Sequence, residues 1–86
     1  MEKKIVIYTT NYCPYCRAAK ALLTAKGVAF SEINVEGDDV KRDWLSRQTG
    51  QSTVPQIFVD NVSYGGFEDI QNLDKQGKLD AIIGLS

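Results

Sequence analysis

The stretch that decides the fold runs from Ile5-Val6-Ile7-Tyr8 into Cys13-Pro14-Tyr15-Cys16. The first segment is a short apolar run with β-branched residues, which predicts a buried strand. Proline is favoured in the first turn of a helix, where its missing N–H loses no hydrogen bond, so a helix is expected from Pro14. Cys13 is therefore expected at the junction between a strand and a helix N-terminus.

The residues that follow complete a strand–helix–strand unit. Apolar side chains recur at helical spacing after Pro14, at Ala18, Ala19, Leu22, Leu23 and Ala25. Gly27 is expected to end this helix, and residues 28–35 predict a second strand. This order implies a right-handed crossover between two parallel strands.

The second half of the chain predicts a helix, a hairpin and a last helical region. Asp38 or Asp39 can cap a helix that runs to about Thr49 and ends at Gly50. Its expected apolar face holds Val40, Trp44 and Leu45. Residues 56–60 and 62–64 predict two antiparallel strands around a tight turn at Asp60-Asn61. A helical region follows Gly65-Gly66 and is broken near Gly77. We therefore expect a single α/β domain over residues 1–86, with a four-stranded mixed sheet (βαβ-ββα) and helices on both faces.

Composition excludes several classes of function. The 86 residues carry a formal net charge of −1, so no charge excess points to nucleic acid or to a membrane surface. No segment predicts a signal peptide or a membrane span, and a cytoplasmic location is expected. The chain has two cysteines and no histidine. In a reducing compartment these cysteines are more plausible as a redox pair or a metal site than as a structural disulfide.

The position of Cys13 favours redox chemistry. At a helix N-terminus its thiolate can accept hydrogen bonds from the amides of Tyr15 and Cys16, and the helix dipole adds to their effect. We expect a pKa below that of a free thiol, which would make Cys13 the nucleophile. Cys16 lies one turn into the helix, where it is expected to be less exposed and able to resolve a mixed disulfide.

Two alternative roles for the cysteine pair remain open. A zinc site normally takes four protein ligands, and this chain offers two thiols and no imidazole. The pair could also be two small buried residues at a helix start. A C-x-x-C motif that follows a strand and opens a helix in a βαβ unit is more typical of a redox site.

Four motifs resemble those of dithiol glutaredoxins in order and spacing: Tyr8-Thr9, Cys13-Pro14-Tyr15-Cys16, Thr53-Val54-Pro55 and Gly65-Gly66. The resemblance covers essentially the whole chain. It implies a thioredoxin-like fold and an enzyme that reduces protein disulfides and glutathione mixed disulfides, with glutathione as reducing co-substrate and no permanently bound cofactor. Its implied partners are glutathione and client proteins carrying disulfides or glutathione adducts. We also expect a monomer that binds neither nucleic acid nor membrane.

The resemblance also implies roles for single residues. Cys13 would be the nucleophile and Cys16 the resolving thiol, and Tyr15 would wall the glutathione groove. Pro55 would be cis, so that the Val54 backbone lies beside the Cys13 sulfur, with Thr53 next to it. The remaining implied contacts are with the two glutathione carboxylates: Gly66 and the amides of Phe67 and Glu68 for the γ-glutamyl carboxylate, and Arg47 for the glycine carboxylate.

The sequence departs from the family pattern at two positions. Thr10 stands where many relatives carry a lysine that meets a glutathione carboxylate, which leaves more of that contact to Arg47, with Gln51 a weaker candidate. Phe67 stands where relatives often have a further cysteine. Asp69 is open between two roles, capping the last helix or binding the amine of the ligand.

Two competing functions can be compared with the main one. Some family members hold an iron–sulfur cluster in a dimer, between two nucleophilic thiolates and two glutathiones. Pro14-Tyr15 argues against this, because the cluster-carrying branch has Gly-Phe. The second competing function is a reductase that takes its electrons directly from a flavoenzyme, as thioredoxins do. Thioredoxins usually have Gly-Pro between their cysteines, whereas this chain has Pro14-Tyr15.

Overall fold

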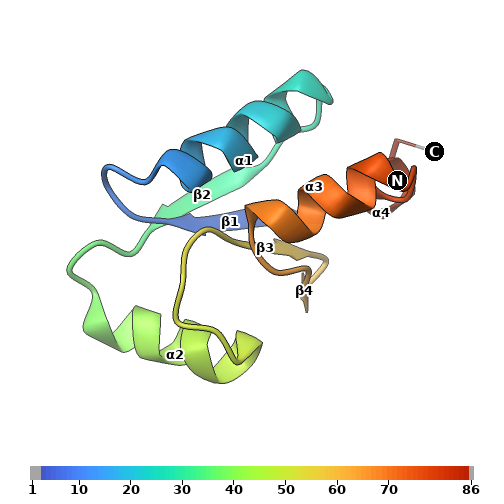
Figure 1. Ribbon diagram of the computed structural model, residues 1–86. Helices are drawn as coiled ribbons and strands as arrows, with labels where there is room; N and C mark the ends of the chain where they lie inside the picture. The colour runs from blue at the N-terminus through green and yellow to red at the C-terminus, as the bar shows by residue number, and fades with distance from the viewer. Residues whose placement is uncertain (1–2, 86) are drawn as a thin grey trace.

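The computed structural model describes residues 3–85, over which the chain forms four strands and four helices (Figure 1). In chain order they are β1 (Ile5–Thr9), α1 (Pro14–Ala25), β2 (Ser31–Asn34), α2 (Asp39–Thr49), β3 (Gln56–Val59), β4 (Val62–Ser63), α3 (Phe67–Lys75) and α4 (Leu79–Ile82).

The strands form one mixed sheet in the order β2-β1-β3-β4. β1 and β2 are parallel, and the β1–β3 and β3–β4 pairs are antiparallel. The β3–β4 turn is made by Asp60 and Asn61 at φ 50° and 68°, positive values that suit a tight hairpin. The predicted four-stranded sheet and its connections are confirmed.

The helices cover both faces of the sheet, as expected. α1 and α3 lie on one face and α2 on the other (Figure 1). The larger core lies under α1 and α3 and includes Ile7, Leu23, Ile57, Ile70 and Leu79. The smaller core lies under α2 and is formed by Tyr8, Val35 and Leu45. Because β1 contributes to both cores, its C-terminal end is held firmly where the loop to α1 begins.

The helix ends follow the sequence signals. The Asp38 side chain accepts a hydrogen bond from the Lys41 amide at 3.0 Å and caps α2. Gly50 ends α2 in the left-handed conformation, at φ 72°. α1 ends at Ala25, and Lys26 just beyond it pairs with Asp74 and Asp80 at 2.6 and 2.8 Å. These ion pairs tie the end of α1 to α3 and α4.

Two sequence expectations about these elements are wrong. The second strand covers only Ser31–Asn34 of the predicted residues 28–35, and these four residues pair with Val6–Thr9 of β1. In the same register residues 28 and 29 lie opposite Lys3 and Lys4, before β1 begins. Val40 does not share the apolar face of α2, since its side chain is 83% exposed. It lies five residues before Leu45, about 140° away around the helix.

An aromatic cluster covers the α2 face of the sheet. The ring of Trp44 lies 5.8 Å from that of Tyr8 and 6.2 Å from that of Phe58, centroid to centroid. Lys41 places its ammonium 5.6 Å from the Trp44 ring. Trp44 remains 41% exposed, so α2 covers this face only in part. Within residues 3–85, no helix has the length and apolar character needed to cross a membrane.

Candidate active site

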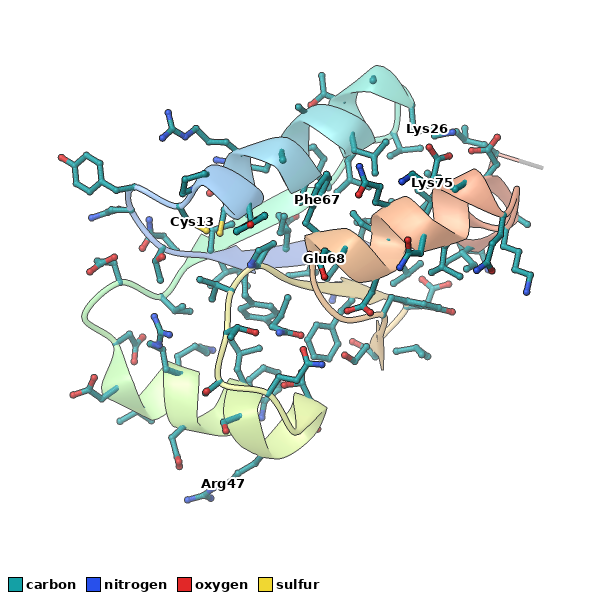
Figure 2. The ribbon with its side chains drawn as sticks, viewed as in Figure 1. Cys13, Lys26, Arg47, Phe67, Glu68 and Lys75 are labelled. Atoms are coloured by element: carbon teal, nitrogen blue, oxygen red, sulfur yellow. The ribbon has the colours of Figure 1, made fainter. Side chains whose placement is uncertain are left out.

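Cys13 is the N-cap residue of α1, as the sequence predicts. Its backbone is extended, at φ −109° and ψ 104°, and its sulfur accepts a hydrogen bond from the Cys16 amide at 3.1 Å. Cys13 is half-buried, whereas Cys16 is only 2% exposed. Figure 2 shows Cys13 where the loop from β1 enters α1. The Cys13 thiol is therefore accessible to solvent in part, whereas the Cys16 thiol is buried.

The segment before β3 approaches Cys13 from the opposite side. The Val54–Pro55 peptide bond is cis. The Val54 carbonyl oxygen lies 3.9 Å from the Cys13 sulfur. Gly66 then comes so close to this segment that a Cβ on it would meet the Pro55 carbonyl oxygen at 3.3 Å. Segments from three parts of the chain thus converge at one end of the sheet.

A groove of about 330 Å³ lies at this convergence, and we call it the cis-proline groove. Its lining residues are Tyr15, Gln51, Thr53, Val54, Pro55, Gly66, Phe67, Glu68 and Asp69. All nine were named from sequence: Gln51 as the weaker carboxylate candidate, Asp69 with its role open, and the other seven as expected glutathione contacts, namely Tyr15, Thr53, Val54, Pro55, Gly66, Phe67 and Glu68. The Tyr15 and Phe67 rings lie 6.5 Å apart across it, centroid to centroid.

The N-terminus of α3 forms one end of the groove, where Figure 2 shows Phe67 and Glu68. The carboxylate of Asp69 accepts a hydrogen bond from the Gly66 amide at 2.9 Å. Asp69 therefore caps the helix, one of the two roles left open by the sequence. The first amides of a helix have no partner inside it, and they attract anions.

Arg47 is the site prediction that the structure does not support. Its guanidinium pairs with Asp43 at 2.7 Å, its side chain is 76% exposed, and it points away from the sheet (Figure 2). It is not among the residues that line the groove. Leu45 faces the sheet, and a residue two positions later lies about 200° around the helix. The spacing within α2 therefore places Arg47 on the side of the helix away from the sheet.

Gln51 lies in the groove instead. Its side-chain oxygen accepts a hydrogen bond from Nε2 of the buried Gln56 at 3.0 Å. This contact fixes the orientation of the amide and leaves the Gln51 NH₂ group to donate elsewhere. The sequence offered Gln51 only as the weaker candidate, because nothing local shows that the loop after α2 runs along the groove.

A second cavity, of about 310 Å³, lies on the other side of Cys13, and we call it the Cys16 cavity. Its lining residues are Thr10, Asn11, Tyr12, Cys13, Cys16, Arg17, Lys20, Glu32 and Asn34. Of the described residues, none lines both cavities. Thr10 therefore belongs to this side and not to the cis-proline groove.

Lys20 and Glu32, which line the Cys16 cavity, form a network with Thr9 that the sequence did not reveal. The hydroxyl of the fully buried Thr9 donates to Glu32 at 2.6 Å. Lys20 donates to both carboxylate oxygens of Glu32, at 3.0 and 3.1 Å. The Thr9 hydroxyl, followed by Lys20, lowers the pKa of Glu32 below its usual value. Only the fold brings these residues together, from β1, α1 and β2.

The arrangement suits exchange between thiols and disulfides. The half-buried Cys13 sulfur at the helix N-terminus can attack a disulfide, and the Cys16 sulfur lies one helical turn away. The cis-proline groove beside Cys13 can bind a substrate. Among residues 3–85, no group of three or more His, Cys, Asp or Glu side chains is placed to hold a metal ion. The glutaredoxin family model matches residues 5–63. The chain belongs to the glutaredoxin family. This glutaredoxin is therefore a glutathione-dependent thiol–disulfide oxidoreductase.

Sequence and structure comparisons agree with this assignment. The chain is 46% identical over 79 residues to glutaredoxin 3 of Escherichia coli, covering 92% of this glutaredoxin and 95% of the relative. It is 48% identical over 79 residues to a Pseudomonas aeruginosa glutaredoxin, covering 92% and 94%.

Solved structures show the same fold. A buckwheat glutaredoxin–glutathione complex superposes with a TM-score of 0.88 at 27% identity, covering 94% of this chain and 76% of that one. A Brucella melitensis glutaredoxin superposes with a TM-score of 0.87 at 39% identity, covering 98% and 91%. The thioredoxin-like fold implied by the sequence motifs is thereby confirmed.

Proposed function

We propose that Cys13 is the nucleophile of this glutaredoxin, that Cys16 is its resolving thiol, and that the cis-proline groove seats glutathione. The observation that carries this proposal is the position of the Cys13 sulfur. This sulfur accepts a hydrogen bond from the Cys16 amide at 3.1 Å, and it lies 3.9 Å from the Val54 carbonyl oxygen at the edge of the groove. A thiolate placed there is stabilised by the helix N-terminus and adjoins the site for its substrate.

Two reactions use this geometry. With a glutathione mixed disulfide, the Cys13 thiolate attacks the glutathione sulfur, a new S–S bond forms, and the client thiolate leaves and takes a proton. A second glutathione thiolate then displaces Cys13 and leaves as glutathione disulfide. With a client disulfide, Cys13 becomes bonded to the client, and Cys16 attacks Cys13 and releases it. Glutathione later reduces the Cys13–Cys16 disulfide.

The groove offers a partner for each end of a glutathione molecule. The amides at the start of α3, at Phe67 and Glu68, suit the γ-glutamyl carboxylate. The Val54 backbone can pair with the cysteine residue in β fashion, with Thr53 and Pro55 beside it and Tyr15 as the wall. We assign the glycine carboxylate to the Gln51 NH₂ group rather than to Arg47. The buckwheat glutaredoxin solved with glutathione supports glutathione as the ligand.

The setting of the reaction is part of the proposal. We propose cytoplasmic, disulfide-bonded or glutathionylated client proteins as the further partners, and a monomer as the active form. A reduced glutathione pool in that compartment supplies the electrons. Pro14-Tyr15 between the cysteines favours this dithiol activity over cluster storage. A brown colour on anaerobic purification would favour storage instead.

The two cysteine variants test the roles. Cys16→Ser should keep activity on a small glutathione mixed disulfide, measured with glutathione, glutathione reductase and NADPH. It should lose most activity on a client with a disulfide and accumulate a mixed disulfide visible by intact mass. Cys13→Ser should lose both activities. Equal loss in both variants on the small adduct would show that the cysteines act as one unit, closer to a thioredoxin.

A further inference from the structure

Cys16 lines the Cys16 cavity and does not line the cis-proline groove. Displacement at sulfur proceeds in line, so the attacking and leaving sulfurs lie on opposite sides of the attacked one. With glutathione in the cis-proline groove, Cys16 attacks Cys13 from the side of the Cys16 cavity. This cavity therefore borders the sulfur that must lose its proton before resolution, and that must hold negative charge whenever the Cys13–Cys16 disulfide is opened.

Burial makes that charge costly. Cys16 is 2% exposed, and the low polarizability of a buried site disfavours a thiolate. A cation nearby offsets this cost. Lys20 follows Cys16 by four residues on α1, so the two side chains occupy one face of the helix, and both line the Cys16 cavity.

Lys20 is held in place by the strand beside it. The Lys20 ammonium donates hydrogen bonds to both carboxylate oxygens of Glu32 on β2. The hydroxyl of the buried Thr9 also donates to Glu32 and holds that carboxylate in place. The other groups with charge or a titratable proton at this cavity are Arg17, Tyr12 and Cys13. On α3, which packs against α1, the carboxylates of Glu68 and Asp69 line the cis-proline groove instead.

We propose that Lys20 is a positioning residue for the resolving step, stabilising the negative charge on the Cys16 sulfur from the Cys16 cavity. This inference rests on the roles proposed above for the two cysteines. In the step, the Cys16 thiol releases its proton to water in the cavity, and its thiolate attacks Cys13. The bond between Cys13 and glutathione breaks, the Cys13–Cys16 disulfide forms, and glutathione leaves as a thiolate that takes a proton. Lys20 itself gains and loses no proton.

The test follows intramolecular disulfide formation. Protein loaded with one glutathione on Cys13 is mixed into buffers of different pH, and release of glutathione is timed by intact mass. Lys20→Met should slow release roughly threefold to tenfold at pH 7 and move its pH midpoint up by about 0.5–1 unit, since a neighbouring cation is lost. Lys20→Arg keeps the charge and should restore both values. Lys75→Met, which removes an exposed lysine from the far end of α3, is the matched control.

Unchanged release in Lys20→Met, or equal slowing in Lys75→Met, would overturn the inference. A second result would also overturn it. If Lys20→Met in a Cys16→Ser protein slowed the reaction of Cys13 with a glutathione adduct as much as it slows glutathione release, the effect would not depend on Cys16. Circular dichroism of each variant shows that the fold is retained. Failure of the cysteine roles is separate: it appears in Cys16→Ser alone, before Lys20 is changed.

Discussion

The backbone amide of Cys16 donates a hydrogen bond to the sulfur of Cys13 across 3.1 Å, inside the first turn of α1. The contact favours a charged sulfur, because an amide donor and the positive end of the helix dipole both point at it. The buried partner supplies the donor through its backbone, while its own side chain stays free for the resolving step.

Alkylation of Cys13 should therefore have a pH midpoint clearly below about 8.5, the value of a free thiol. The rate of reaction with iodoacetamide against pH measures it, in a Cys16→Ser protein so that a single thiol reacts. Cys16→Ser keeps the backbone amide that makes the contact. A midpoint at or above the free-thiol value would remove the basis for Cys13 as nucleophile.

Gln51 and Arg47 should differ in their effect on glutathione adducts. Gln51→Ala should raise KM by about 3–10-fold with kcat nearly unchanged, because one hydrogen bond made equally in ground and transition states is lost. Gln51→Glu should raise KM further by placing like charge against a carboxylate. Arg47→Ala, which removes only an exposed pair with Asp43, should change KM by less than about twofold. The reverse ranking would return the glycine carboxylate to Arg47.

Gly65 and Gly27 form a matched pair for the start of α3. Both have positive φ, 86° and 75°, so alanine at either costs about 1–2 kcal/mol in unfolding free energy. A Cβ at Gly65 would also collide with the Asp69 carboxylate, whereas nothing lies within 4 Å of one at Gly27. Gly65→Ala should lower the unfolding free energy by about 1 kcal/mol more than Gly27→Ala, because the Asp69 cap is lost as well. It should also raise KM for glutathione adducts. Urea unfolding and steady-state kinetics measure the two effects; equal values for both variants would contradict the role of the Asp69 cap.

Glu32 should make stability depend on pH in the acid range. Its pKa is lowered in the folded state from 4.5, chiefly by the Thr9 hydroxyl and then by Lys20. The stabilisation is therefore complete above pH 4.5 and is lost as pH falls through the lower folded value. Glu32→Gln should be less stable than the parent at pH 7, and the difference in unfolding free energy should narrow as pH falls below 4.5. Urea titrations at pH 7 and at a series of acid pH values would show it. A difference that stays constant would mean that the carboxylate charge does not matter.

The sequence predicted the sheet, the helix caps and the cysteine pair because each rests on local chemistry. Pro14, Asp38 and Gly50 mark helix ends through their own backbone properties, and the structure places all three where expected. The length of β2 was not predictable in this way. Residues 28 and 29 lie opposite Lys3 and Lys4, before the partner strand begins, and strand pairing depends on two segments at once.

The part of the site that consists of sequence motifs could be predicted. The part in which residues distant in sequence are brought together by the fold could not. The groove residues around Pro55 and Phe67 belong to motifs that name them. Lys20 and Glu32 meet only because α1 lies over β2, and neither residue type signals a site by itself. Arg47 is a different case: the structure pairs its guanidinium with Asp43, and it is not among the residues that line the groove.

The aromatic cluster under α2 has an optical consequence. Trp44 is the single tryptophan of the chain, and it lies against Tyr8 and Phe58 on the face of the sheet opposite α1. The sheet therefore separates the indole from both sulfurs, which could otherwise quench it on contact. Its emission should therefore report the docking of α2, and in the folded state it should differ little between the oxidised and the reduced protein.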